Sequence, residues 1–174
     1  MKLEIIKKLT PSSPEISEKK SKIHNALSTE DVLLKLAYCK LTNKEMDFIL
    51  GKYLDDDESL SHFYKVFLYE LNNNNTYKSE EKDLVCSVVK ASLIELTVIK
   101  CPFCSGRGFY KLKNNIQKCH HCVDGDFIYT DNIRANLLKM NQKQYKKIAP
   151  MHKNIREEIE SIEIDALEKI GDTS

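Results

Sequence analysis

Two pairs of cysteines, each with two residues between its members, constrain the fold of this chain more than any other feature of its sequence. Cys101-Pro-Phe-Cys104 and Cys119-His-His-Cys122 are separated by 14 residues, a spacing typical of sites in which four cysteines hold one zinc ion. Each pair turns two thiolates toward one point, and two such pairs complete a tetrahedron. We therefore expect one structural Zn²⁺, and its predicted ligands are Cys101, Cys104, Cys119 and Cys122.

The segment around the cysteine pairs has the residues that tight turns require. Glycine allows positive φ and lets backbone amides approach sulfur, and the glycines that follow the pairs are Gly106, Gly108 and Gly125. Phe109–Lys113 and Ile116–Lys118 can form a short hairpin closed at Asn114-Asn115. A segment of about 30 residues cannot bury a core of its own, so we expect metal binding to supply its stability.

Other roles for the cysteines and histidines are alternatives to zinc binding. Free structural cysteines are one alternative, and a dithiol redox centre is another, but the latter normally lies in a thioredoxin-like βαβ context that this helical sequence lacks. His120 or His121 could replace a cysteine as ligand; with four cysteines available, we expect both near the site or at the surface. Cys39 and Cys86 lie in apolar helical patterns, which predicts ordinary buried thiols.

Upstream of the cysteines, apolar residues recur with the period of amphipathic helices. The first predicted helix has Ser28 as its N-cap, and its inward face comprises Val32, Leu33, Leu36, Ala37 and Leu41. The later helices are predicted to begin at the capping box of Thr42 and Glu45, at Leu60 and at Ser79. Before them, Pro11 and Pro14 lie among serines and charged residues, a composition that is typical of a linker.

Downstream of the cysteines, two helical patterns follow each other. Asp131–Lys139 has a good N-cap in Thr130, Met140-Asn141 interrupts it, and Gln142 begins the next helix. Two helices joined by a turn of three or four residues, the second basic and polar at its start, are typical of a helix-turn-helix that enters the major groove of DNA. A helical hairpin with solvated lysines is the alternative, and the sequence alone favours neither.

The end of the chain has a different character from the basic helices before it. Pro150 is expected to kink the segment that follows. From Ile155 to Ile170, apolar residues form a stripe along an acidic helix, which most simply packs on the core. The acidic face of this helix could also repel DNA or contact a protein.

Charge is distributed unevenly, although the net charge is only +1. Residues 101–156 carry 11 basic and 3 acidic side chains, whereas residues 157–174 carry 1 and 7. Lysine and arginine mainly contact phosphate, and asparagine and glutamine suit the edge of adenine. The predicted contacts to double-stranded DNA are Arg107, Lys111, Lys113, Lys118, Arg134, Lys139, Asn141, Lys143, Gln144, Lys146 and Lys147.

Several function classes are disfavoured by the sequence. A closed site of four sulfurs leaves no open position for substrate, and no phosphate-binding glycine loop, metalloprotease helix or nucleophile elbow occurs elsewhere, so we expect no enzyme. No run of about 18 apolar residues occurs, and the first residues lack a signal-peptide pattern. We expect a protein of the reducing cytoplasm, with no membrane partner.

These patterns predict a mainly α protein with four segments. They are an N-terminal arm or linker (1–27), a helical domain (28–98), an inserted four-cysteine zinc hairpin (99–129), and a helix-turn-helix-like part with an acidic C-terminal helix (130–174). An apolar content of 41% is enough to bury a core in a chain of 174 residues.

The sequence resembles the late-gene antitermination proteins Q of lambdoid phages, in the subfamily with a zinc-binding motif. The likeness covers most of the chain in order. It includes the opening Met1-Lys2-Leu3-Glu4, Pro11-Ser12-Ser13-Pro14, Leu27-Ser28 with Asp31-Val32, the knuckle Cys101-Pro-Phe-Cys104-Ser-Gly-Arg-Gly108 and the helices through Ile170. The knuckle alone is shared with DnaJ-type chaperone cofactors, so the combination carries the resemblance.

The resemblance implies a DNA-binding protein of the host bacterial cytoplasm that recognises an element near the phage late promoter. It would join paused RNA polymerase with its sigma factor and promote read-through of terminators. The Thr130–Ala149 region would hold the DNA-contacting helices. The chain departs from the family pattern in the second knuckle, Cys122-Val-Asp-Gly125-Asp126, and in having no tryptophan, whose place Tyr145 could take.

Two other functions compete with this reading. A conventional zinc-braced repressor or activator would bind DNA without joining polymerase. A DnaJ-like protein-interaction module is the less favoured alternative, because that domain uses four knuckles and this chain has two and no His-Pro-Asp signature.

Overall fold

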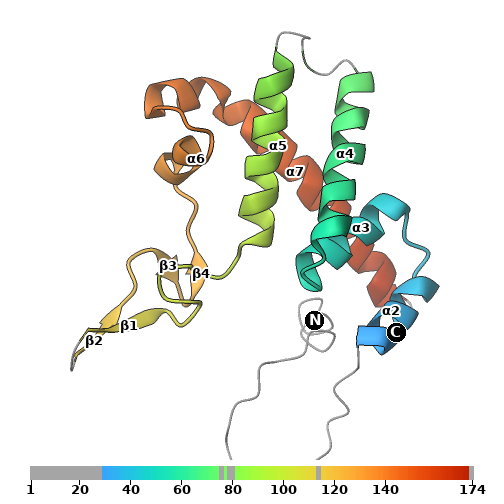
Figure 1. The fold of residues 1–174 in the computed structure, drawn as a ribbon, viewed down its shortest axis with the longest axis horizontal. Coiled ribbons are helices and arrows are strands. Elements are labelled where there is room, and N and C mark those ends of the chain that lie inside the picture. Colours follow the sequence, from blue (N-terminus) through green and yellow to red (C-terminus); the bar gives the residue numbers. More distant parts are fainter. Residues whose placement is uncertain (1–28, 75–76, 78–80, 113–114, 173–174) are drawn as a thin grey trace, which may run out of the picture. The chain divides into compact units, whose positions relative to one another are not determined.

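The computed structural model describes residues 29–74, 77, 81–112 and 115–172 and is mainly helical (Figure 1). In chain order the elements are α2 (Thr29–Tyr38), α3 (Asn43–Tyr53), α4 (Asp57–Asn73), α5 (Lys82–Thr97), β1 (Phe109–Leu112), β2 (Asn115–Lys118), β3 (Cys122–Val123), β4 (Asp126–Phe127), α6 (Asp131–Leu137) and α7 (Gln142–Asp172). Within these ranges no helix is both long and apolar enough to span a lipid bilayer. The predicted arm 1–27 and the predicted N-cap Ser28 lie outside the described residues.

The residues group into two compact units, and two helices contribute to both. The first unit comprises the described residues up to Val66 together with those from Ser161 onward, and the second runs from Phe67 to Glu160. The second unit therefore contains the cysteine segment and the helices on either side of it. The last turns of α7 belong with α2 and α3, the part of the chain most distant from them in sequence.

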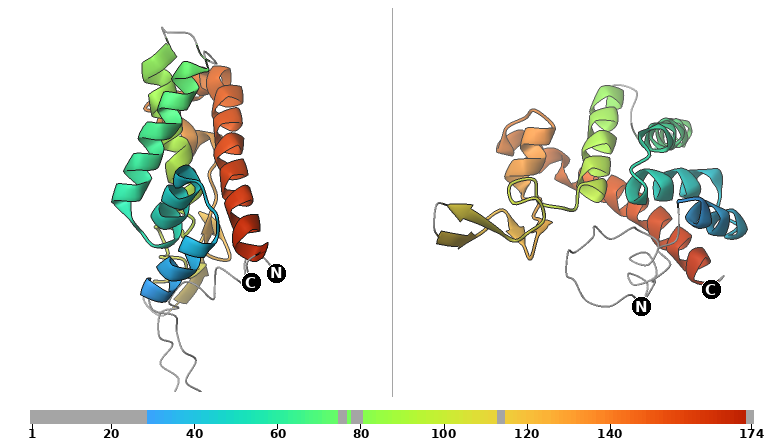
Figure 2. Two further views of the ribbon diagram at one scale, coloured as in Figure 1. Left: turned by 90° about the vertical axis from the view of Figure 1, so that its right-hand side faces the viewer. Right: turned by 60° about the horizontal axis from the view of Figure 1, so that its bottom comes forward.

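The first unit is built on an apolar core that joins both ends of the described chain (Figure 2). Val32, Leu36 and Cys39 of the α2 region pack with Ile49 of α3 and with the α7 residues Ala166 and Ile170. On the α3–α4 side, the rings of Phe48 and Phe63 are fully buried, with centroids 5.0 Å apart. The acidic C-terminal helix thus packs on the core with its apolar stripe, as the sequence predicts.

Polar side chains fix the start of α3 within this unit. The predicted capping box is confirmed: Glu45 N–H donates to Thr42 Oγ1 at 3.3 Å, and Thr42 N–H donates to Glu45 Oε2 at 2.7 Å. Lys169 also donates to both Glu45 oxygens, at 2.6 and 2.8 Å. Burial by itself raises the pKa of Glu45, but the hydrogen bonds from Lys169 and Thr42 outweigh it and lower the pKa.

A second buried ionic group ties α3 to α7. Lys52 donates to both carboxylate oxygens of Glu163, at 2.6 and 2.7 Å, and the Tyr53 hydroxyl also donates to Glu163. Burial and the adjacent carboxylate raise the pKa of Tyr53, so its hydroxyl stays protonated as the donor.

The second unit buries one face of α5 and the first part of α7. The α5 residues Val85, Val88, Val89, Leu93 and Leu96 are buried, and so are Tyr145, Ile155 and Ile159 of α7. Arg134 of α6 forms a two-point ion pair with Glu95 of α5, with Nε–Oε2 at 2.9 Å and Nη2–Oε1 at 2.5 Å. This pair ties α6 to α5, and only 7% of the Glu95 side chain is exposed.

Two small antiparallel hairpins follow α5. β1 pairs with β2 from Phe109–Lys118 to Leu112–Asn115, which confirms the predicted hairpin. The predicted turn at Asn114-Asn115 is wrong in part, because Asn115 belongs to β2 and pairs with Leu112; residues 113 and 114 lie outside the described part. β3 and β4 pair through Cys122–Phe127 and Val123–Asp126 (Figure 1). Lys100 also forms a bridge with Asp126, which brings the start of the cysteine segment against its end.

The helix boundaries differ from the sequence prediction in a few places. The α2 helix ends at Tyr38, Leu33 is 43% exposed and Ala37 is exposed, so the buried face follows Val32, Leu36 and Cys39 instead. The predicted inward face includes residues that are exposed, because the elements that pack against a helix determine which of its apolar residues become buried. The described α5 begins at Lys82, with the predicted start Ser79 outside the described residues. Pro150 lies inside α7, and the predicted kink at this residue stays a prediction.

Candidate metal centre

The four predicted cysteines are brought together in the second unit, and all four are buried. Their sulfur atoms lie within 4.8 Å of one another, with Cys101–Cys119 at 3.8 Å and Cys104–Cys122 at 3.6 Å. Sulfurs at the corners of a tetrahedron around an ion, with bonds of about 2.3 Å, would be about 3.8 Å apart. A disulfide requires about 2.05 Å, so these distances fit four thiolates around one metal ion and not two disulfides.

Two glycines let the knuckles approach each other closely. Gly125 has φ of 103°, and a Cβ at this position would lie 2.1 Å from the carbonyl oxygen of Gly106. The carbonyl of Gly125 in turn accepts a 2.8 Å hydrogen bond from the N–H of Cys101. The backbone of the second knuckle therefore contacts the backbone of the first directly, and only glycine at position 125 leaves room for this contact.

Backbone amides and burial act on the sulfurs in opposite directions. Burial raises the pKa of Cys104, but the 3.3 Å hydrogen bond from the N–H of Gly108, together with those from the other thiols, lowers this pKa to about 7. Cys122 is affected mainly by burial and by Cys104 and Cys119, which raise its pKa to about 12. A cation at the centre would favour the thiolate form of every sulfur.

Aromatic rings surround the cysteines on one side. Phe103 of the first knuckle is 60% exposed and stacks on His121 of the second, with ring centroids 4.0 Å apart. Phe127 packs against the cysteine cluster and contacts the ring of Tyr129 edge-on. His120 and His121 are both exposed and lie outside the metal-ligand group, as expected for residues near the site.

The cysteine segment is anchored to the end of α5. The Tyr129 hydroxyl lies 3.2 Å from the carbonyl oxygen of Ile94 and 3.1 Å from that of Val98, and it can donate to either. The N–H of Phe127 donates to the carbonyl of Ile99 at 2.8 Å. Burial raises the pKa of Tyr129, and Glu95 adds to this, so the hydroxyl remains a donor. These hydrogen bonds therefore connect the cysteine segment to the end of α5, the helix that carries Glu95.

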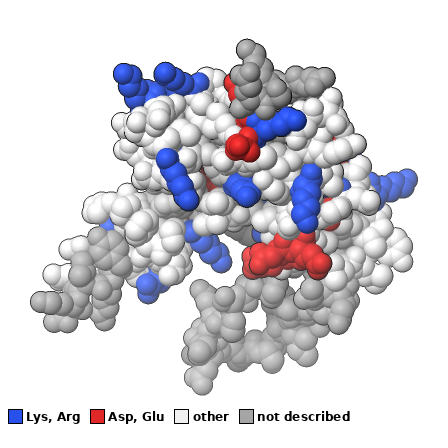
Figure 3. Space-filling view, turned by 45° about the horizontal axis from the view of Figure 1, so that its top comes forward, with Lys and Arg blue, Asp and Glu red and all other residues white. Residues whose placement is uncertain are grey.

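Many of the predicted DNA contacts are exposed in the structure. They are Arg107, Lys118, Lys139, Asn141, Lys143, Gln144, Lys146 and Lys147. Arg107 also donates from Nε to the carbonyl of Cys104 at 3.0 Å. The side chain of Lys111 and the whole of Lys113 lie outside the described part of the chain. Figure 3 shows several Lys and Arg side chains and also a group of Asp and Glu side chains on the surface.

Three of the predicted DNA contacts have partners within the protein that the sequence analysis did not predict. Asn141 Oδ1 accepts from Gln144 N–H at 2.9 Å, and Gln144 Oε1 accepts from Asn141 N–H at 3.0 Å. This reciprocal pair caps the start of α7, and its i, i+3 spacing was visible in the sequence. Arg134 is committed to Glu95 and has 25% of its side chain exposed.

A buried polar group centred on Glu95 was also missed. Around its carboxylate lie Arg134, His152 Nε2 at 3.9 Å and Arg156 Nε at 3.9 Å. His152 is 1% exposed, and its Nδ1 lies 3.2 Å from the Tyr145 hydroxyl. Its sequence signal is a charged residue, Glu95, among the apolar residues of α5, because charged side chains are seldom buried without partners.

Comparisons of the chain with models of known protein families, with curated proteins and with solved structures each found no match.

Proposed function

We propose that the four-cysteine cluster holds one zinc ion and that this ion braces a DNA-binding helix pair, α6 and α7. Four thiolates suit Zn²⁺, which accepts a tetrahedral sulfur shell and has no redox chemistry to oxidise its ligands. The four buried sulfurs and their spacing carry this part of the proposal. Zinc would fix the relative positions of the knuckles, and through Tyr129 it would fix the start of α6.

The arrangement of α6 and α7 supports DNA binding. α6 is short and has Thr130 as its N-cap, Leu138–Asn141 forms the turn, and Lys139 adopts φ of 53° there. The first turns of α7 expose Lys143, Lys146 and Lys147. A second helix that begins with exposed cations after a four-residue turn is suited to contacting phosphates beside the major groove. Arg134 has a positioning role in this proposal, because Glu95 holds its guanidinium.

Antitermination is the specific activity we infer, and the sequence resemblance supports it. The knuckle Cys101–Gly108 and the order of the helices after it resemble those of the late-gene antitermination proteins Q. The protein would bind double-stranded DNA near a late promoter, contact RNA polymerase with its sigma factor and promote read-through of a downstream terminator.

Single-round transcription tests this activity. The template carries the cognate late promoter and a downstream terminator, and bacterial RNA polymerase with its primary sigma factor transcribes it with and without the zinc-loaded protein. Read-through that disappears when the promoter-proximal element is scrambled supports the antiterminator. Unchanged termination with the protein bound to the template would exclude it and leave a conventional DNA-binding regulator.

DNA binding has a separate test in its salt dependence. If the basic residues neutralise about five phosphates, the log–log slope of affinity against salt should be about −4 to −5. Lys146→Ala should keep the fold and weaken binding about equally for all sequences. Cys104→Ser should abolish DNA binding, because the loss of zinc would unfold the cysteine segment that positions α6 and α7. A flat salt dependence would contradict the DNA-binding proposal.

A protein-interaction module is the second candidate, and one observation favours it. The cysteine segment exposes several large apolar side chains, with Phe103 at 60%, Val123 at 56% and Ile116 at 72%. Apolar side chains in such number on a small segment are typical of protein contacts. Sequence-specific DNA binding by the full chain would exclude this reading as the main function.

A further inference from the structure

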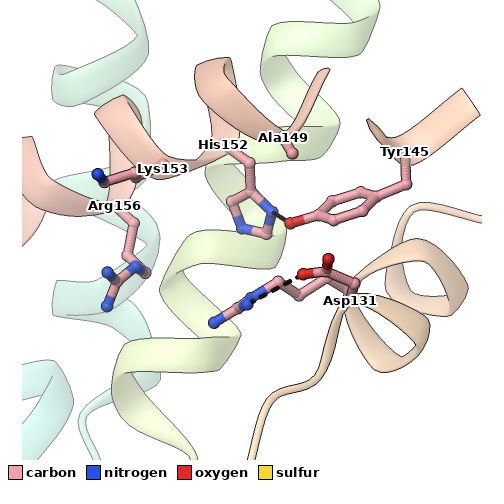
Figure 4. Close-up of a pocket in the computed structure, with 7 residues that line it drawn as sticks. Asp131, Tyr145, Ala149, His152, Lys153 and Arg156 are labelled. Atoms are coloured by element: carbon pink, nitrogen blue, oxygen red, sulfur yellow. Dashed lines mark hydrogen bonds and ion pairs between the residues drawn. The ribbon is translucent and has the colours of Figure 1, made fainter. Parts of the chain in front are cut away.

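A cavity of about 230 Å³ opens between α6 and the first part of α7 in the second unit (Figure 4). Its wall is formed by Asp131, Arg134, Tyr145, Ala149, His152, Lys153 and Arg156. Five of these residues carry hydrogen-bond donors, three of them cationic, and Asp131 is the one carboxylate in the wall. A cavity so rich in donors suits a ligand rich in acceptors.

His152 lies in the wall of this cavity and carries a buried polar atom without a partner. Its Nε2 is one of two buried side-chain polar atoms in the described part of the chain that have no hydrogen-bond partner. Nδ1 faces the Tyr145 hydroxyl, and Nε2 lies on the other side of the ring (Figure 4). A buried polar atom without a partner costs free energy, so a ligand atom that pairs with it gains that free energy back.

The surroundings indicate which proton His152 carries. If Nε2 were unprotonated, its lone pair would face the carboxylate of Glu95 at 3.9 Å, and two acceptors would repel each other. The favoured form has Nε2–H, with Nδ1 accepting from the Tyr145 hydroxyl. At 3.9 Å, Glu95 is too distant to accept a hydrogen bond from Nε2–H, so this buried donor has no acceptor among the described residues.

The charges around the cavity limit the charge of the ligand. Lys153 pairs with Glu157 at 3.7 Å and Arg156 with Glu160 at 2.6 Å, and both are i, i+4 pairs near the surface. Pairs of this kind contribute little to stability, so an oxyanion can replace them. Glu95 pairs with Arg134 and also lies 3.9 Å from Nε of Arg156, and Asp131 pairs with Arg134. Both carboxylates remain in place, which disfavours a ligand with two or more negative charges.

We propose that this cavity binds a phosphate-type oxyanion carrying one negative charge, held by Lys153 and Arg156 and by the Nε2–H of His152. The ligand could be a free oxyanion or a phosphodiester of a nucleic-acid backbone, since both present the same singly charged oxygens. The site does not depend on the function proposed above, because a small phosphodiester can occupy it without DNA.

Titration of the zinc-loaded full chain with dimethyl phosphate tests the site. The readout is the set of imidazole resonances of His152, identified by their loss in His152→Gln. Lys153→Glu should weaken binding by about 10-fold or more, because it removes a charge-assisted contact and adds repulsion. Lys82→Glu is the matched control: it makes the same charge change at an exposed position of α5 that does not line the cavity, so binding should change less than about 2-fold.

A second titration with duplex DNA identifies the source of the oxyanion. If Lys153→Glu weakens DNA binding more than Lys82→Glu does, the cavity takes a backbone phosphate. If the two variants bind DNA alike while dimethyl phosphate still discriminates between them, the cavity takes a free oxyanion. Two results would overturn the proposal. One is that dimethyl phosphate does not shift the His152 resonances, and the other is that Lys153→Glu and Lys82→Glu weaken the binding of dimethyl phosphate equally.

Discussion

The cysteine segment and the first unit are held together by different forces. Among the described residues of 99–129, the buried side chains are those of the four cysteines. The first unit instead buries Phe48, Phe63 and the Val32–Ile170 cluster, and it adds the ion pairs of Glu45 and Glu163. In the proposed arrangement, the chain relies on a metal ion where it has few apolar residues and on packing where it has many.

The largest predicted effect follows from replacing one sulfur, which should disrupt the cysteine segment and leave the first unit folded. Cys104→Ser leaves three thiolates, and because metal binding contributes apparent free energies of order 10 kcal/mol, the segment around β1–β4 should lose its structure. Far-UV circular dichroism should still show the helices of the first unit. Thiolate-to-cobalt absorption measures the site, and Cys39→Ser, a buried thiol of the other region, should leave that absorption unchanged. An intact cobalt spectrum in Cys104→Ser would show that the metal does not need this sulfur.

A core substitution in the first unit should lower its stability without changing the metal site. Phe48→Ala removes a fully buried ring that packs on Phe63 and should cost about 3–5 kcal/mol in the free energy of unfolding. Chemical denaturation measures this loss, and metal affinity should not change. Tyr38→Ala removes a ring that is 73% exposed and should cost less than about 0.5 kcal/mol. A fall in metal affinity in Phe48→Ala would mean that the two regions are coupled in stability.

A smaller change tests the contact between the knuckles. Gly125→Ala places a methyl group 2.1 Å from Gly106 oxygen at positive φ, which should cost about 3 kcal/mol and weaken metal binding in competition titrations. Gly171→Ala is the control, because its Cβ meets nothing within 4 Å. Alanine favours a helix over glycine, so this variant should gain up to about 1 kcal/mol. Equal metal affinity in both variants would contradict the close contact.

The smallest predicted effect concerns pH and the second unit. Burial lowers the pKa of His152 below 6.5, with Arg134 and Arg156 acting in the same direction and Glu95 opposing them. The unfolded chain therefore binds a proton at this residue before the folded chain does, so stability is full above about pH 6.5 and falls as pH decreases below it. Thermal unfolding between pH 7.5 and 5 measures this, and His152→Gln should reduce the slope. An equal slope in both proteins would assign the pH dependence to other groups.

Local patterns in the sequence predicted most of the helices and the clustering of the four cysteines. The capping box at Thr42 and the N-cap at Thr130 depend on residues three positions apart, and the cysteine pairs carry their own geometry. The pairing of Asn141 with Gln144 has the same local character and could have been predicted, although these residues were interpreted as DNA contacts.

Long-range pairs could not be derived from the sequence. Arg134 and Glu95 are 39 positions apart, and Lys169 and Glu45 are 124 apart, so no periodicity connects them. The same limit applies to the first unit, where the end of α7 completes a core begun by α2. Which edge of a helix becomes buried depends on such partners, and Leu33 was misplaced for that reason.

The turn between α6 and α7 has a consequence for protein engineering. Lys139 adopts φ of 53°, a conformation that costs a lysine about 1 kcal/mol and glycine almost nothing. Selecting variants for heat resistance alone would therefore favour glycine at this position, whereas selecting for function would retain an exposed cation beside α7. A library screened in both ways would separate these two demands at a single residue.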